Sequence, residues 1–215
     1  MKITPTIAET GAEALRSRLH SEPPLLPLRP MRSDYDLNPL ARPDLPRELT
    51  PAAVLVPIVR RSDPTVLFTR RTEHLARHAG QVSFPGGRLH SDDRSLVATA
   101  LRETEEETGL DARVVSIAGF LDAYETATDF AILPVVGVVP AEIVLDPNPG
   151  EVAEAFEVPL AFLLDPRNCR RESRILRGRS REFHAFTWDR HYIWGATAAI
   201  VVNLRERLCG EDFRR

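Results

Sequence analysis

Three glutamates near the middle of the chain are spaced for metal chemistry. Glu103, Glu106 and Glu107 stand at positions i, i+3 and i+4, which an α-helix places within about 100° of arc on one face. Like charges at this spacing repel one another, and a bound cation would remove that cost. Mg²⁺ prefers oxygen ligands and completes its shell with water and substrate phosphate oxygens. The spacing therefore indicates a metal-assisted phosphoryl reaction, against the alternative of a merely solvated acidic face.

A helix over residues 95–108 is expected to carry these glutamates. Val97, Leu101 and Thr104 lie on an adjoining helix face and can anchor it to a sheet, which leaves the acidic face outward. Gly109 supplies a left-handed stop after the helix. A preceding loop with Gly86 and Gly87 can approach closely, because glycine has no Cβ. Loop, helix and glycine stop are thus expected to build one site.

The rest of the chain alternates short β-rich runs with helical patterns. Two further helices are predicted, at 159–164 and 196–208, where apolar residues recur at helical spacing. Strands are predicted at 53–59, 65–69, 81–84, 114–121, 132–139, 173–176 and 182–187. This mixture predicts an α+β domain with a mixed sheet over residues 50–215.

The first 49 residues have a different character. Residues 7–19 show the spacing of a short amphipathic helix, and a proline-rich stretch follows it without any sustained period. Together, residues 1–49 are interpreted as a helix and an extended segment packed on the surface of the domain. A linker between two separate domains is the alternative.

Composition and charge limit the function classes. The chain has 215 residues, of which 43% are hydrophobic and 27% charged, with a formal net charge of −3. These values are typical of a globular domain and favour neither a nucleic-acid partner nor a membrane surface. The first residues lack the apolar run of a secretory signal. Cys169 and Cys209 are too few for a disulfide framework, so the expected compartment is a reducing cytoplasm. A homodimer is compatible with the sequence.

The acidic segment resembles the sequence box of the Nudix hydrolases, G-x5-E-x7-R-E-U-x-E-E-x-G-U, in which U is bulky and apolar. The matching residues are Gly87, Arg102, Glu103, Glu106, Glu107, Gly109 and Leu110. Two positions depart from the box. Asp93 stands for the first glutamate, with eight residues instead of seven before Arg102, and Thr104 stands where U is expected.

A second signature narrows the resemblance to the coenzyme A pyrophosphatase branch of the family. Its pattern, T-x-R-[SA]-x3-R-x3-G-x3-F-P-G-G, is matched by Thr69, Arg71, Gly80, Phe84, Pro85, Gly86 and Gly87. Thr72 replaces the usual Ser or Ala, and Ala76 occupies the second arginine position with Arg77 beside it. Further matches at 133–137, 151–152, 158–160 and 193–198 extend the resemblance over roughly residues 50–205.

This resemblance implies an α/β/α Nudix sandwich and a reaction. The enzyme would hydrolyse the diphosphate bond of coenzyme A (CoA) or its thioesters with Mg²⁺ or Mn²⁺, giving 3',5'-ADP and 4'-phosphopantetheine. Glu103 and Glu107 would be the leading metal ligands, with Glu106 as a further ligand or proton acceptor. Arg102 is expected to brace the loop through an acidic partner such as Asp93. The alternatives are hydrolysis of another nucleoside diphosphate derivative, such as ADP-ribose or NADH, and a Nudix-fold binding protein without turnover.

Residues outside the box complete the expected site. Glu151 is a candidate catalytic base, with a surface carboxylate as the alternative. Gly86 and Gly87 would line the substrate, and the 3'-phosphate of CoA would meet Arg70, Arg71 and Arg77. An arginine-rich stretch at 167–181 is the second choice for that cationic role, against the alternative of a solvated hairpin. Trp188 and Trp194 are interpreted as packing residues and not as a platform for adenine.

Overall fold

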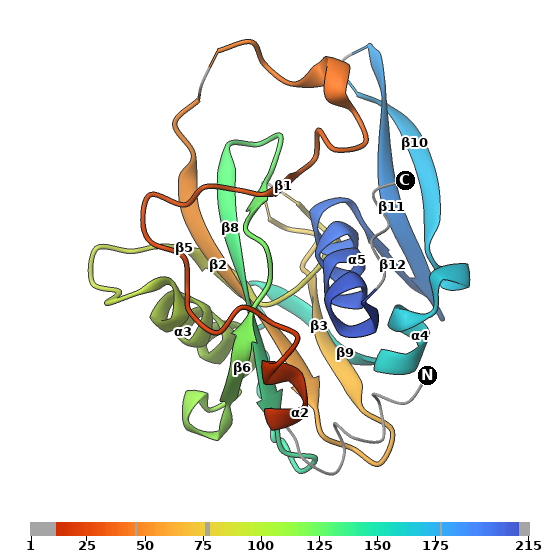
Figure 1. Ribbon diagram of the computed structural model, residues 1–215. Helices are drawn as coiled ribbons and strands as arrows, with labels where there is room; N and C mark the ends of the chain where they lie inside the picture. The colour runs from red at the N-terminus through yellow and green to blue at the C-terminus, as the bar shows by residue number, and fades with distance from the viewer. Residues whose placement is uncertain (1–11, 46, 76–77, 177, 211–215) are drawn as a thin grey trace.

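Two long parallel strands form the middle of the fold. The structure is a computed structural model, and it describes residues 12–45, 47–75, 78–176 and 178–210. The strands are β2 (Thr50–Val59) and β8 (Phe130–Val139), and they pair along their whole length (Figure 1). Both are almost continuously apolar, as strands buried on both faces of a sheet must be.

The other strands extend this pair into a mixed sheet. Within the described residues the sheet has nine strands, and its main path runs β1-β7-β8-β2-β3-β4. Off this path, β5 pairs with β2, β6 with β8 and β9 with β3. Their bounds are β1 (Arg32–Ser33), β3 (Thr65–Arg71), β4 (Val82–Ser83), β5 (Gly86–Arg88), β6 (Ser116–Phe120), β7 (Tyr124–Glu125) and β9 (Val152–Pro159).

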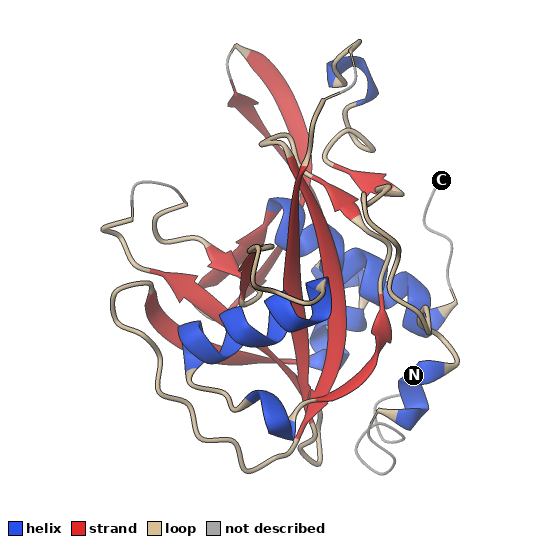
Figure 2. Cartoon of the chain, turned by 90° about the vertical axis from the view of Figure 1, so that its left-hand side faces the viewer, coloured by secondary structure: helices blue, strands red, loops and turns tan. Residues whose placement is uncertain are grey.

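Helices cover both faces of this sheet. On one face, Ala53 and Leu55 of β2 pack with Ala100 of α3 (Leu96–Thr108). On the other face, Val56 packs with Val201 of α5 (Gly195–Cys209). Figure 2 shows α3 in front of the long strands. The alternation of side chains along a strand thus fills two cores, and the predicted α/β/α sandwich is confirmed.

A second, antiparallel sheet stands beside the first. It consists of β10 (Arg170–Leu176), β11 (Arg179–Trp188) and β12 (His191–Trp194), in that order. The chain reaches it from β9 through α4 (Leu160–Leu164) and a short 3-10 turn, η3 (Pro166–Asn168). None of the helices in the described ranges is long and apolar enough to cross a membrane.

The N-terminal segment is anchored to the main sheet at several points. Helix α2 (Glu13–Arg16) lies beside β6, and β1 pairs in parallel with β7. Leu28 and Tyr35 are buried, so the proline-rich stretch is more than a surface connection. A 3-10 turn, η1 (Pro39–Ala41), follows them. Residues 7–11 of the predicted N-terminal helix lie outside the described residues.

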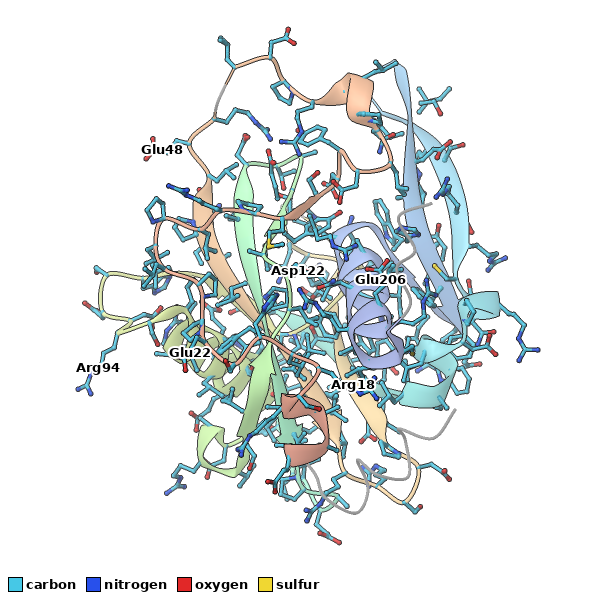
Figure 3. The ribbon with its side chains drawn as sticks, in the orientation of Figure 1. Arg18, Glu22, Glu48, Arg94, Asp122 and Glu206 are labelled. Atoms are coloured by element: carbon cyan, nitrogen blue, oxygen red, sulfur yellow. The ribbon has the colours of Figure 1, made fainter. Side chains whose placement is uncertain are left out.

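Buried charges hold this segment to α5. The Asp122 carboxylate accepts a hydrogen bond from Arg32 Nε at 3.2 Å and another from Arg207. Arg32 also donates to Glu206 of α5 at 2.5 Å, and Figure 3 shows Asp122 and Glu206 close together in the centre of the molecule. Arg18 donates to the carbonyl of Leu208 at 2.8 Å, near the end of α5.

Most predicted elements are present, with local differences. Val114, where the sequence predicted the start of a strand, ends a 3-10 turn, η2 (Ala112–Val114), and β6 begins at Ser116. Gly86 and Gly87 belong to β5 and not to a loop, because their backbone pairs with Ala53 and Val54 of β2. Strands β1, β7, β9 and β12 were not predicted.

Candidate active site

Helix α3 begins and ends as its sequence predicts. The hydroxyl oxygen of Ser95 accepts a hydrogen bond from the backbone N–H of Ala98 at 3.2 Å and caps the first turn. Gly109 adopts the left-handed conformation, with φ of +70°, and its N–H donates to the carbonyl of Glu105. The box glutamates are therefore held on a helix with both ends fixed.

Strand β5 approaches this helix so closely that glycine is required. A Cβ atom built on Gly87 would lie only 2.4 Å from the carboxyl carbon of Glu103. The N–H of Gly86 donates to Oε2 of Glu107 at 3.3 Å. Both glycines thus bring backbone against the carboxylates at i and i+4, as the sequence indicated.

Glu107 is the most buried of the three glutamates. Its exposed fraction is 3%, and Arg71 Nη1 lies 3.6 Å from its Oε1. Burial raises the pKa of Glu107 to about 7, although Arg71 and the Gly86 N–H favour the charged form. The charges of Glu103 and Glu151 add to the rise. The acidic face is therefore not uniformly outward, because β3 and β5 cover one of its carboxylates.

Arg102 makes the bracing contact expected of it. Its Nε and Nη2 atoms each donate to one oxygen of Asp93 at 2.9 Å. These bonds hold the pKa of Asp93 well below its usual range. Arg102 Nη1 also lies 3.0 Å from an oxygen of Glu103 and 3.0 Å from one of Glu106. Asp93 therefore fixes the arginine that orients two box glutamates.

The arginines proposed for substrate binding are placed differently from one another. Arg70 and Arg71 follow one another at the end of β3, where the register with β9 shifts. Arg70 Nε lies 3.5 Å from Glu154, whereas Arg71 reaches Glu107. Arg71 Nε is buried and has no hydrogen-bond partner among the described residues. Arg77 lies outside them. A shifted register re-aims side chains, and here it directs Arg71 to the carboxylates.

Glu151 lies close enough to Glu107 to influence its charge. It stands directly before β9, and its carbonyl accepts a hydrogen bond from the N–H of Thr72 at 2.9 Å. Glu154, by contrast, is part of β9 and contacts Arg190 at 2.6 Å. The strand was missed in the sequence, although the apolar residues Val152, Phe156 and Val158 lie at even-numbered spacings along the chain, as on one face of a strand.

The comparison with known proteins shows the family of the chain. Residues 49–177 match the model of the NUDIX domain. The chain belongs to the Nudix family. The uncharacterized Nudix hydrolase NudL of Yersinia pestis (strain Pestoides F) is 41% identical over 157 residues, which cover 73% of this chain and 79% of that protein. NudL of Yersinia pseudotuberculosis serotype O:1b (strain IP 31758) matches with the same identity and coverage.

The chain is also similar to solved structures. The MutT protein from Methanosarcina mazei Go1 has 25% sequence identity and a TM-score of 0.44, and the match covers 56% of this chain and 84% of that chain. As a Nudix hydrolase, the chain is a pyrophosphohydrolase of nucleoside diphosphate derivatives. Nudix hydrolases generally use divalent metal ions such as Mg²⁺ or Mn²⁺.

The carboxylates present suit a metal that is shared with substrate. Within the described ranges, no three His, Cys, Asp or Glu side chains are arranged to enclose a metal ion. The carboxylates of Glu103 and Glu107 nonetheless lie against two adjacent residues of β5, Gly87 and Gly86 respectively. Mg²⁺ is usually held by one or two carboxylates, with water and substrate phosphates as its other ligands. The Nudix helix therefore fits such an ion through these two glutamates, with Glu106 half exposed beside them.

Proposed function

We propose that this Nudix hydrolase cleaves the diphosphate bond of CoA or its thioesters. The products would be 3',5'-ADP and 4'-phosphopantetheine or its acyl derivative. The observation that carries the proposal is the contact of Arg71 with Glu107 at 3.6 Å. Arg71 belongs to the signature that resembles the CoA pyrophosphatase branch, so that signature and the Nudix helix meet in one site. We assign the reaction to residues 50–215.

In this reaction the protein would bind and orient the diphosphate. A Mg²⁺ or Mn²⁺ ion held by Glu103 and Glu107 would neutralise phosphate charge and lower the pKa of a bound water. Arg71 would donate to a diphosphate oxygen, because its buried Nε has no hydrogen-bond partner in the part of the chain that the structure describes. The contact with Glu107 favours the diphosphate over the 3'-phosphate as the ligand of Arg71.

Two carboxylates are candidates to accept the proton of the attacking water. Glu106 is 57% exposed at its side chain and contacts Arg102, so it is open to solvent at the edge of the site. Glu151 lies near Glu107 and outside the box. A general base must lie within hydrogen-bond reach of the water, so substitution of each glutamate separately would assign the role.

The same diphosphate site could serve ADP-ribose or NADH, which is the alternative substrate class. A contact with the shared diphosphate cannot discriminate among these substrates. Retention of Glu103, Glu106 and Glu107 argues against a binding protein without turnover. The reducing cytoplasm is the proposed location, since two cysteines, Cys169 and Cys209, are too few for a disulfide framework.

Product analysis tests the proposal. The purified protein is incubated with Mg²⁺ or Mn²⁺ in ¹⁸O-water and with CoA, an acyl-CoA, 3'-dephospho-CoA, ADP-ribose or NADH in parallel. We expect CoA to be the best substrate and to yield 3',5'-ADP and 4'-phosphopantetheine, with the label on one of them. Release of a free thiol from an acyl-CoA would instead indicate a thioesterase, and a preference for ADP-ribose would replace CoA as the substrate.

A further inference from the structure

The outer face of the small sheet carries aromatic and cationic side chains that the proposed chemistry does not use. In the strand register, Arg174 pairs with Arg181, and Ala185 pairs with Trp194. Because side chains alternate along a strand, these residues share one face with Phe183 and Tyr192. The opposite face holds Phe186 and Ile193, which pack in the core with α5. The aromatic face is therefore the one turned away from α5.

Trp194 is the centre of this face. Its ring centroid lies 5.2 Å from that of Phe183 and 6.5 Å from that of Tyr192. The guanidinium carbon of Arg174 lies 5.3 Å from the centroid of Trp194. Aromatic rings and guanidinium planes are the surfaces on which nucleotide bases stack. Trp194 and Arg174 together thus form a platform for a base.

The same face holds two arginines, Arg174 and Arg181, that have no carboxylate partner among the described residues. Arg174 and Arg181 stand directly opposite each other, an arrangement that destabilises a strand pair. The ion pairs of this hairpin within the described residues join Arg170 to Glu172 and Arg171 to Glu182, and leave these two arginines out. Residues 167–182 contain seven arginines and two glutamates in a chain of net charge −3. A bound anion would relieve the repulsion.

Two contacts connect this sheet to the candidate active site. Thr197, one turn after Trp194, donates its hydroxyl to the carbonyl of Val82 at 3.3 Å. Val82 stands four residues before Gly86, a separation of at most about 14 Å along the chain. On the other side, the ring of His191 stacks on Phe156 of β9 with centroids 3.6 Å apart. Thr197 belongs to α5, and His191 lies on the same face of β12 as Ile193, so these contacts place the start of α5 and the inner face of the small sheet beside β4 and β9, which lead into the carboxylate site.

We propose that the outer face of β10–β12 binds the adenine and the 3'-phosphate of the substrate. The inference rests on the proposed function, because it takes the substrate to be an adenosine 3'-phosphate. Trp194 and Arg174 stack on the base, and the edges of Arg174 and Arg181 donate to the phosphate. A guanidinium can do both, since its faces stack while its N–H groups donate in the plane. Trp194, first interpreted as a packing residue, becomes part of the substrate site.

Binding of the product 3',5'-ADP in metal-free buffer tests this inference without turnover. Titration calorimetry compares the wild type with Arg174→Ala and Arg181→Ala, with 5'-AMP as the ligand that lacks the 3'-phosphate. Each substitution should weaken 3',5'-ADP binding about tenfold to a hundredfold, as expected for one charge-assisted contact, and should change 5'-AMP binding less. Arg167→Ala is the matched control, because Arg167 is exposed and donates to Asp165.

The base platform is tested separately. Trp194→Leu should weaken the binding of both 3',5'-ADP and 5'-AMP by about fivefold or more, because stacking acts on the adenine that they share. Trp194→Phe should restore much of the binding, and thermal unfolding verifies that each variant is folded. In turnover, Arg174→Ala should lower kcat/KM for CoA more than for 3'-dephospho-CoA.

The outcomes separate this inference from the proposed function. If the wild type does not bind 3',5'-ADP, or if Arg174→Ala and Arg181→Ala bind it as the wild type does, the face is not the nucleotide site, even when CoA is hydrolysed. If CoA is not hydrolysed but the variants lose 3',5'-ADP binding, the proposed function fails and the nucleotide site stands. Losses confined to variants that no longer fold would also overturn the assignment.

Discussion

The three box glutamates of α3 have different environments in this protein. Glu107 is buried against Arg71, Glu103 lies over Gly87, and Glu106 is largely exposed beside Arg102. Burial under the ends of β3 and β5 raises the pKa of Glu107 to about 7. Identical charges on one helix face therefore need not contribute equally to metal binding or to turnover.

Glu107→Gln should abolish hydrolysis and leave the fold intact. The amide keeps the volume of the buried side chain but removes a metal ligand, so we expect kcat/KM to fall by at least about 100-fold. Glu103→Gln should act in the same direction and more weakly. The measurement is kcat/KM at saturating metal, with Tm to verify folding. Glu105→Gln is the control, since Glu105 is exposed on another face of α3. Turnover like that of the wild type in Glu107→Gln would remove this glutamate from the site.

The spacing of the glutamates predicted their shared site, but not their unequal burial. Burial depends on which strand ends cover the helix, and the i, i+3, i+4 pattern has no information on that. The contact between Arg71 and Glu107 likewise depends on the register shift at the end of β3. The Arg102–Asp93 pair could be anticipated, because both residues belong to one local segment.

At the scale of elements, the strands that the sequence did not predict are explained by the strands with which they pair. The sequence of β5 is Gly-Gly-Arg, which has little strand propensity, and it is extended because β2 supplies its hydrogen bonds. Strands β1 and β7 have only two residues each, too few for any period. Strand β9 was different, since Val152, Phe156 and Val158 alternate and could have been recognised. The long apolar strands and the capped helix were predicted because each has its own local signal.

Gly87→Ala tests the approach of β5 to α3. A methyl group there would fall 2.4 Å from the Glu103 carboxyl carbon, so this side chain must move away from its position. We expect kcat/KM to fall about tenfold to a hundredfold, while stability falls by about 1–3 kcal/mol, the usual cost of overpacking. Kinetics and urea unfolding measure the two effects.

A double variant identifies the cause of that loss. If Gly87→Ala acts by displacing Glu103, then Gly87→Ala combined with Glu103→Gln should have nearly the activity of Glu103→Gln alone. If the fold-loss of kcat/KM in the double variant equals the product of the losses in the two single variants, the methyl group disturbs the site by another route, such as movement of the Gly86 N–H.

At the scale of the whole molecule, one buried carboxylate joins segments that are distant in sequence. Asp122 lies between β6 and β7 and has His20 and Arg32 from the N-terminal segment as partners. From α5 it receives Arg207 and the side-chain amide of Asn203 at 3.0 Å. The N-terminal segment is therefore part of the folded unit, and the network should contribute to global stability.

The free energy of unfolding should depend on Asp122 at acid pH. Burial alone would raise its pKa, but the hydrogen bonds from His20, Arg207 and Asn203 and the charge of Arg207 outweigh burial and lower the pKa to about 2 from 3.8. A carboxyl group with a lowered pKa stabilises the fold above its unfolded pKa, and the stabilisation disappears as the pH falls from 3.8 toward about 2. The difference corresponds to about 2 kcal/mol.

Urea unfolding of the wild type and of Asp122→Asn between pH 5 and pH 2 measures this contribution. Above pH 4 the variant should be the less stable, and the gap should shrink by about 2 kcal/mol toward pH 2, because the wild-type carboxylate becomes protonated there. Asp165→Asn is the control, since burial does not protect its ion pair with the exposed Arg167. Added salt of 0.5 M, a concentration that reduces the Debye length to about 4 Å, should suppress the control effect and largely preserve that of Asp122. Parallel stability curves for the wild type and Asp122→Asn would mean that this network does not hold the N-terminal segment to α5.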